Sequence, residues 1–153
     1  MFCPFSESCF AYQKNKIENL PFKEKKLKIK KRYLNFLVTK TENKKTYIQK
    51  REGKGIWQGL YQFPIVESNK LLTKEELLIT EEFNNLYPYK TTLSLFNKKE
   101  IIHKLSHQHL HSQFWIIETS KVKEAQTDWN EIEKYAVPVL ISRFLNEYLE
   151  KSN

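Results

Sequence analysis

All three glycines of this 153-residue chain fall within seven positions, at Gly53, Gly55 and Gly59. Glycine allows a backbone to turn with a positive φ, so tight turns and close packing are predicted for this one stretch. Elsewhere the chain has few residues that break regular structure, with five prolines and no internal repeat. A loop-dominated or repeat protein is therefore disfavoured, and the length fits one ordinary domain with a short extension.

Strands are predicted from short runs of β-branched and aromatic residues. The predicted strands lie at residues 33–39, 46–50, 91–96, 101–105 and 110–118. The first two are separated by a polar turn and are expected to pair as a β-hairpin. The last two are separated by residues 106–109 and form a second pair.

Two helices complete the predicted architecture. The first covers residues 74–86, with Thr73 as its N-cap and two glutamates in its first turn. The second follows Pro138 and is amphipathic, with an apolar face made of Leu140, Phe144, Leu145 and Tyr148. The predicted order of elements is β-β-β-α-β-β-β-α, with a third strand before the first helix, and it indicates an α+β fold in which a mixed β-sheet packs with two helices.

The positive charge is concentrated near the beginning of the chain. Residues 1–32 carry nine Lys and Arg against three Glu, whereas residues 33–153 carry seventeen against fifteen acids. The run that ends in Lys28, Lys30, Lys31 and Arg32 is suited to contact phosphates without reading sequence. A solvated linker is the alternative interpretation. No apolar run approaches the ~18–20 residues that span a bilayer, so we expect a cytoplasmic protein and no membrane partner.

Three separated segments carry recognisable patterns: Cys3-Pro4 with Cys9, residues 54–64 (KGIWQGLYQFP) and residues 105–110 (LSHQHL). In this order they resemble the C-terminal region of the MutY family of adenine DNA glycosylases. That family carries Gly-Leu-Trp-x-Gly-Leu-x-x-Phe-Pro and Phe-Ser-His-x-x-Leu stretches. The resemblance implies a Nudix-like domain at residues 33–153, preceded by a basic interdomain linker at 19–32 and the tail of an iron–sulfur loop at 1–18.

The resemblance also implies a function in base excision repair. A domain of this kind recognises 8-oxoguanine opposite adenine in bacterial double-stranded DNA. The adenine is cleaved by an N-terminal glycosylase domain of the same protein. This chain by itself is therefore expected to be non-catalytic, although it belongs to a hydrolase of N-glycosyl bonds.

The two cysteines, Cys3 and Cys9, fit the final interval of the family's iron–sulfur motif. A [4Fe–4S] cluster needs four thiolates, and the chain contains two. The resemblance therefore places the cluster in the full-length protein and predicts none in this fragment. Two free thiols are the alternative.

The histidine-rich stretch is the candidate binding site. His103, His107, His109 and His111 are the only histidines, and alternate positions on a strand share a face, so a metal site is one interpretation. A hairpin with ordinary exposed histidines is another.

The resemblance supplies a third interpretation of the same stretch, in which the loop is inserted at the lesion. Ser106 would then bond the Hoogsteen edge of 8-oxoguanine, Leu105 would wedge against a base step, and His107 would contact phosphate or hold the loop. The family has phenylalanine where this chain has Leu105.

Two rival functions remain open at the level of sequence. A Nudix hydrolase of damaged nucleotides needs clustered carboxylates to hold Mg²⁺, and the candidates are Glu75, Glu76, Glu81 and Glu82. Their spacing departs from the hydrolase signature, and a solvated helix face explains them better. The other rival is a protein-interaction module that uses an aromatic surface near Trp57 and Trp115. Buried tryptophans would weaken that interpretation.

Overall fold

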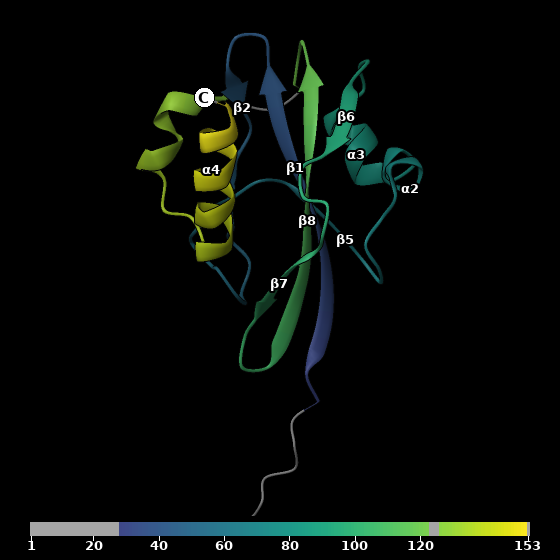
Figure 1. The fold of residues 1–153 in the computed structure, drawn as a ribbon, viewed down its shortest axis with the longest axis vertical. Coiled ribbons are helices and arrows are strands. Elements are labelled where there is room, and N and C mark those ends of the chain that lie inside the picture. Colours follow the sequence, from purple (N-terminus) through teal and green to yellow (C-terminus); the bar gives the residue numbers. More distant parts are fainter. Residues whose placement is uncertain (1–27, 123–125, 153) are drawn as a thin grey trace, which may run out of the picture.

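A five-stranded mixed sheet forms the centre of the computed structural model, which describes residues 28–122 and 126–152 (Figure 1). Its strands follow the order β5–β1–β8–β6, and β7 pairs with β8 beyond the end of β6. The strands are β1 (Lys30–Thr41), β5 (Ile65–Ser68), β6 (Thr92–Leu95), β7 (Ile101–Lys104) and β8 (Gln108–Thr119). The two long strands, β1 and β8, run parallel to each other, and the other pairings are antiparallel.

Strands β1 and β8 hold the middle of the sheet, and both of their faces are buried. Each strand contains six consecutive buried residues, a pattern typical of strands that are covered on two sides. Helix α4 (Val139–Ser152) covers one face, and α2 (Lys74–Leu78) and α3 (Glu81–Leu86) cover the other (Figure 1). The predicted α+β fold with a mixed sheet is therefore confirmed, and the described residues contain three α-helices where two were expected.

Stacked aromatic rings fill the core beneath α4. The ring of Phe144 lies parallel to that of Phe114, with centroids 4.1 Å apart, and Phe114 stacks in turn on Phe36 at 4.7 Å. The rings of Phe63 and Phe96 stand nearly perpendicular to the ring of Phe144. Aromatic pairs of this kind stabilise the fold by more than the burial of their surface area alone. The predicted apolar face of the last helix is confirmed, since all four of its members are buried.

The predicted hairpin of residues 33–39 and 46–50 is wrong. A turn does follow β1, where the amide of Lys44 donates to the carbonyl of Thr41 and Lys44 has a φ of 55°. The ladder positions of β1 are taken by β5 and β8 instead, because a strand buried on both faces needs a neighbour along each edge. The short β2 (Lys45–Thr46) pairs with β9 (Thr127–Asp128), and β3 (Gln49–Lys50) pairs with β4 (Tyr61–Gln62).

The helix predicted over residues 74–86 is divided in two at Thr80. The N-cap at Thr73 is confirmed: its hydroxyl accepts from the amide of Glu76, and the Glu76 carboxylate accepts from the amide of Thr73. Thr80 interrupts the helix because its hydroxyl donates to the carbonyl of Leu77 and caps α3 at the amide of Phe83. A 3₁₀ helix, η2 (Trp129–Lys134), was not expected from the sequence.

Strands β6, β7 and β8 lie where the sequence placed them. Strand β1 begins earlier than predicted, at Lys30, so the last three residues of the segment predicted as a linker belong to the sheet. Among the described residues, no helix is long and apolar enough to cross a bilayer.

Candidate nucleic-acid interface

The turn between β7 and β8 carries the three residues that sequence analysis assigned to lesion recognition, and we call residues 105–107 the recognition loop. The amide of Leu105 donates to the carbonyl of Gln108 over 2.8 Å, which closes a tight turn. Ser106 and His107 are exposed at its tip. Leu105 is half-buried and packs against the core under α4. The loop therefore has an apolar base and presents a hydroxyl and an imidazole to solvent.

The beginning of β1 lies directly beside this loop. The amide of Lys30 donates to the carbonyl of His107 over 3.1 Å, and in the parallel ladder Lys30 stands opposite Gln108. Lys28, Lys30 and Lys31 are exposed. The basic run and the loop are far apart in the sequence, and the parallel pairing of β1 with β8 brings them together.

Arg32 differs from the three lysines because its guanidinium is bound within the chain. Its Nε and a terminal nitrogen donate to the two carboxylate oxygens of Glu67, over 2.6 and 2.7 Å, and its other terminal nitrogen donates to Gln108 over 3.2 Å. The Arg32 side chain is 15% exposed. The hydrogen bonds from Arg32 hold the pKa of Glu67 below its usual value, and the same pair raises the pKa of Arg32. Glu67 could not be anticipated, since the antiparallel register of β1 and β5 is what brings it to Arg32.

The four histidines do not converge. His107 lies in the loop, and His103 stands opposite Leu110 on the face away from His109 and His111. The Nδ1 of His111 lies 2.9 Å from the Glu100 carboxylate. Across residues 28–122 and 126–152, no group of three or more His, Cys, Asp or Glu could hold a metal ion. The possible histidine metal site is thus not formed, because the turn breaks the strand alternation on which it depended.

The glycine-rich stretch forms a loop next to β7. Gly55 and Gly59 have φ values of 129° and 82°, and Trp57 has a φ of 62°, so the predicted tight turns are confirmed. The predicted close packing is wrong, because a Cβ added at any of the glycines would meet open space. The Trp57 ring is half-buried and lies 6.2 Å from that of His103.

Tryptophan burial argues against a protein-interaction module built on an aromatic surface. Trp115, on the central strand β8, is only 4% exposed and belongs to the core beneath α2 and α3. Trp57 packs against the core on the other face. Neither ring presents the open aromatic surface that this interpretation requires.

The four candidate glutamates are divided between two short helices. Glu75 and Glu76 lie in the first turn of α2, and Glu81 and Glu82 lie in the first turn of α3. The Glu76 carboxylate is already used in the capping box with Thr73. Capping and favourable interaction with the helix dipole account for these residues, as the solvated-face interpretation expects.

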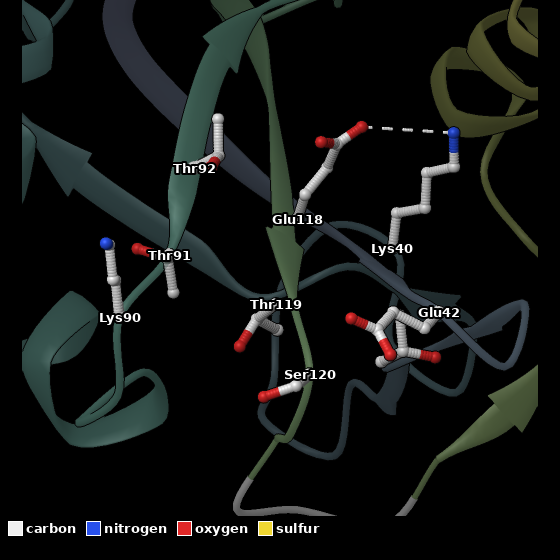
Figure 2. A pocket seen from close by; sticks show the side chains of 9 residues that line it. Lys40, Glu42, Lys90, Thr91, Thr92, Glu118, Thr119 and Ser120 are labelled. Atoms are coloured by element: carbon white, nitrogen blue, oxygen red, sulfur yellow. Dashed lines mark ion pairs between the residues drawn. The ribbon is translucent and has the colours of Figure 1, made fainter.

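A polar hollow of about 570 Å³ lies at the opposite end of the sheet (Figure 2). It sits where β1 and β8 end, about 35 Å from the recognition loop at ~3.3 Å per strand residue. Lys40 and Glu118 form an ion pair of 3.9 Å within it. The hollow is lined by lysines, glutamates and hydroxyl residues, so it carries no single sign of charge. The lining residues are Lys40, Thr41, Glu42, Lys90, Thr91, Thr92, Glu118, Thr119 and Ser120. The sequence contained no pattern that pointed to this hollow.

The cysteines predicted as cluster ligands, Cys3 and Cys9, lie outside the described residues. The basic residues before Lys28 also lie outside them.

Comparison with known proteins identifies a family and several proteins of similar fold. A family model described as a NUDIX domain matches residues 35–147. An adenine DNA glycosylase from Buchnera aphidicola subsp. Baizongia pistaciae is 31% identical over 118 residues, which cover 75% of this chain and 30% of that protein. The chain thus spans less than a third of that relative's length.

Solved structures give the same result for the fold. The C-terminal domain of mouse MUTYH, solved in complex with human PCNA, is 17% identical with a TM-score of 0.62, and the match covers 79% of this chain and 89% of that one. The MutT protein from Methanosarcina mazei Go1 is 11% identical with a TM-score of 0.61, covering 83% and 99%.

Proposed function

The chain belongs to the NUDIX domain family, as a C-terminal domain of the MutY-like type, and from this premise we propose that it recognises 8-oxoguanine opposite adenine in duplex DNA. The observation that carries the proposal is the exposed recognition loop beside the basic start of β1. In this proposal the domain locates the lesion, and an N-terminal glycosylase domain of the same bacterial protein cleaves the adenine. This chain contributes binding energy and no catalytic group.

The chemistry of the loop tip suits an oxidised purine. Guanine presents N7 as an acceptor in the major groove, and oxidation at C8 turns N7 into a donor. The Ser106 hydroxyl can accept from that donor, because a hydroxyl serves as donor or acceptor according to its rotation. Its exposure at the end of a closed turn leaves it free to meet a base edge.

The neighbouring residues have different roles in this proposal. Leu105 anchors the loop through its buried part and offers its remaining surface as an apolar contact to a base step. His107 donates to a phosphate, and its carbonyl is held by Lys30. Lys28, Lys30 and Lys31 attract the backbone, whereas Arg32 supports the sheet edge through Glu67.

The proposed full-length protein carries a [4Fe–4S] cluster outside this domain. Cys3 and Cys9 would supply two of its four thiolates, because their spacing is similar to the final interval of the family's cluster motif.

The proposal is tested by the ratio of two dissociation constants measured with this chain. One duplex contains 8-oxoguanine opposite adenine, and the other contains guanine opposite adenine. A good base contact is worth roughly 1–3 kcal/mol, so Ser106→Ala is expected to lower the preference for 8-oxoguanine by about fivefold or more.

The matched control is Ser120→Ala, which removes an exposed hydroxyl from the distant hollow. The control is expected to keep the ratio of the unaltered chain. If Ser106→Ala also keeps it, the proposed reading of the lesion is refuted.

A further inference from the structure

On one face of the sheet, the side chains become more polar and more exposed from one row to the next toward the recognition loop. Directly opposite residues on neighbouring strands share a face, so each step can be read as a row. Leu37 and Trp115 form an apolar row, buried with α2 and α3. The next row pairs Asn35 with Gln113, whose amides are buried and hydrogen-bonded to each other over 2.6 Å.

The following row is only partly covered. Tyr33 and His111 are opposite each other and their rings stack, with centroids 5.0 Å apart. Ile102 on β7 extends this row and is 44% exposed. The Nδ1 of His111 is held by Glu100, so the acidic group near this row already has a partner.

The last row before the loop is cationic. It consists of Lys31 on β1, His109 on β8 and Lys104 on β7, and we call these three residues the cationic row. Both lysines are exposed and His109 is half-buried. Within the described part of the chain, neither lysine is in a salt bridge. The row lies on the sheet face opposite to the Arg32–Glu67 pair, so no carboxylate of that pair neutralises it.

We infer that the cationic row holds the phosphate backbone of one DNA strand next to the lesion. Nothing in the sequence around Lys104 and His109 points to phosphate binding, and the row exists because β1, β8 and β7 align side by side. The inference rests on the proposed function, since the recognition loop sets which stretch of duplex the row faces.

The dimensions of the row match this occupant. Three neighbouring strands at ~4.8 Å place the outer lysines about 10 Å apart. A DNA strand carries one phosphate per ~3.4 Å of helix axis, and neighbouring phosphates lie farther apart than this rise because the strand winds around the axis, so the row reaches roughly two neighbouring phosphates. The lysines supply charge, and the His109 imidazole supplies an N–H donor between them. Contacts of this kind bind every sequence alike and position the loop for reading.

The test is the salt dependence of DNA binding by the whole chain. Binding to the 8-oxoguanine and guanine duplexes is measured by fluorescence anisotropy. A variant carrying Lys31→Gln and Lys104→Gln loses two phosphate contacts. The slope of log affinity against log salt is then expected to fall by about 1.8, at ~0.9 per contact. Between 200 and 50 mM salt, the variant gains about tenfold less affinity than the unaltered chain. The affinity of the variant for both duplexes is expected to fall by the same factor.

The control variant carries Lys90→Gln and Lys121→Gln, which remove the same charge from exposed positions at the far end of the sheet. Equal slopes for the two variants overturn the inference. A loss confined to the 8-oxoguanine duplex also overturns it, because the row would then read a base. Unchanged melting temperatures of both variants exclude misfolding as the cause.

The Ser106→Ala ratio separates the two proposals. One outcome is that the cationic-row variant has the same salt slope as its control, while Ser106→Ala lowers the preference for the 8-oxoguanine duplex. The role of the cationic row is then refuted, and lesion recognition by the loop stands. The opposite outcome is that the cationic-row variant has a lower salt slope, while Ser106→Ala leaves the ratio of the two dissociation constants unchanged. The cationic row is then a general nucleic-acid surface, and lesion recognition by the loop is refuted. Absence of binding by the unaltered chain at 50 mM salt refutes both.

Discussion

Replacing Glu67 by glutamine is expected to change both DNA binding and acid stability, because Glu67 forms an ion pair with Arg32. The two hydrogen bonds of 2.6 and 2.7 Å join a side chain that is 15% exposed to one that is 46% exposed. Loss of the carboxylate charge frees one cation at the start of β1. The log–log salt slope is then expected to steepen by about 0.9, which is roughly a 3.5-fold extra gain in affinity between 200 and 50 mM salt.

The stability cost of Glu67→Gln is small at neutral pH. A partly exposed pair of this geometry contributes up to about 1 kcal/mol to the free energy of unfolding. Arg32 lowers the pKa of Glu67, so that contribution is present above the pKa of Glu67 in the unfolded chain and is lost as pH falls through the lower folded value. Urea unfolding of both proteins from pH 7 to pH 3 should show the difference between them shrinking.

Glu118→Gln is the matched control for Glu67→Gln. It removes the same charge from an ion pair, with Lys40, at the opposite end of β1 and β8. Its salt slope is expected to match that of the unaltered chain. Identical slopes for both variants would show that Arg32 does not face DNA even when it is released.

Three further substitutions test the fold. Phe144→Ala is expected to lower the free energy of unfolding by about 3–5 kcal/mol in urea, because it empties the centre of the aromatic stack, whereas a loss under 1 kcal/mol would contradict the packing described. Burial raises the pKa of Tyr87 to about 12, so its neutral form stabilises the fold below pH ~10 and that contribution disappears by about pH 12. In Tyr87→Phe, the free energy of unfolding should fall less steeply between these pH values. If it falls as steeply as in the unaltered chain, the stabilising role of neutral Tyr87 is refuted. Thr73→Ala should cost about 1 kcal/mol by removing the cap of α2, measured in the same urea assay, and no loss would argue against the capping box.

The elements that the sequence predicted well are those with strong local signals. Thr73 followed by Glu76 is a complete capping box, and the apolar spacing around Phe144 marks one helix face. Residues 101–118 form a local hairpin, so its strands and its loop could be found without knowing the rest of the fold. The position of Ser106 and His107 at an exposed tip follows from that hairpin.

The features that the sequence did not reveal depend on contacts between distant residues. The parallel pairing of β1 with β8 joins residues that are 78 positions apart, and it replaced the hairpin that proximity in sequence suggested. The same pairing creates the cationic row, and the β1–β5 register brings Glu67 to Arg32. Thr80 broke a helix whose apolar pattern continued through it, because a local cap competed with the helical hydrogen bonds.

Lesion reading by the recognition loop can be followed through backbone amide chemical shifts measured during titration with the two duplexes. We expect the shifts of Ser106 and His107 to differ between the 8-oxoguanine and guanine duplexes, while those of Lys31 and Lys104 move equally in both. Identical shifts at Ser106 and His107, with the difference instead centred on Glu118 at the distant hollow, would contradict it.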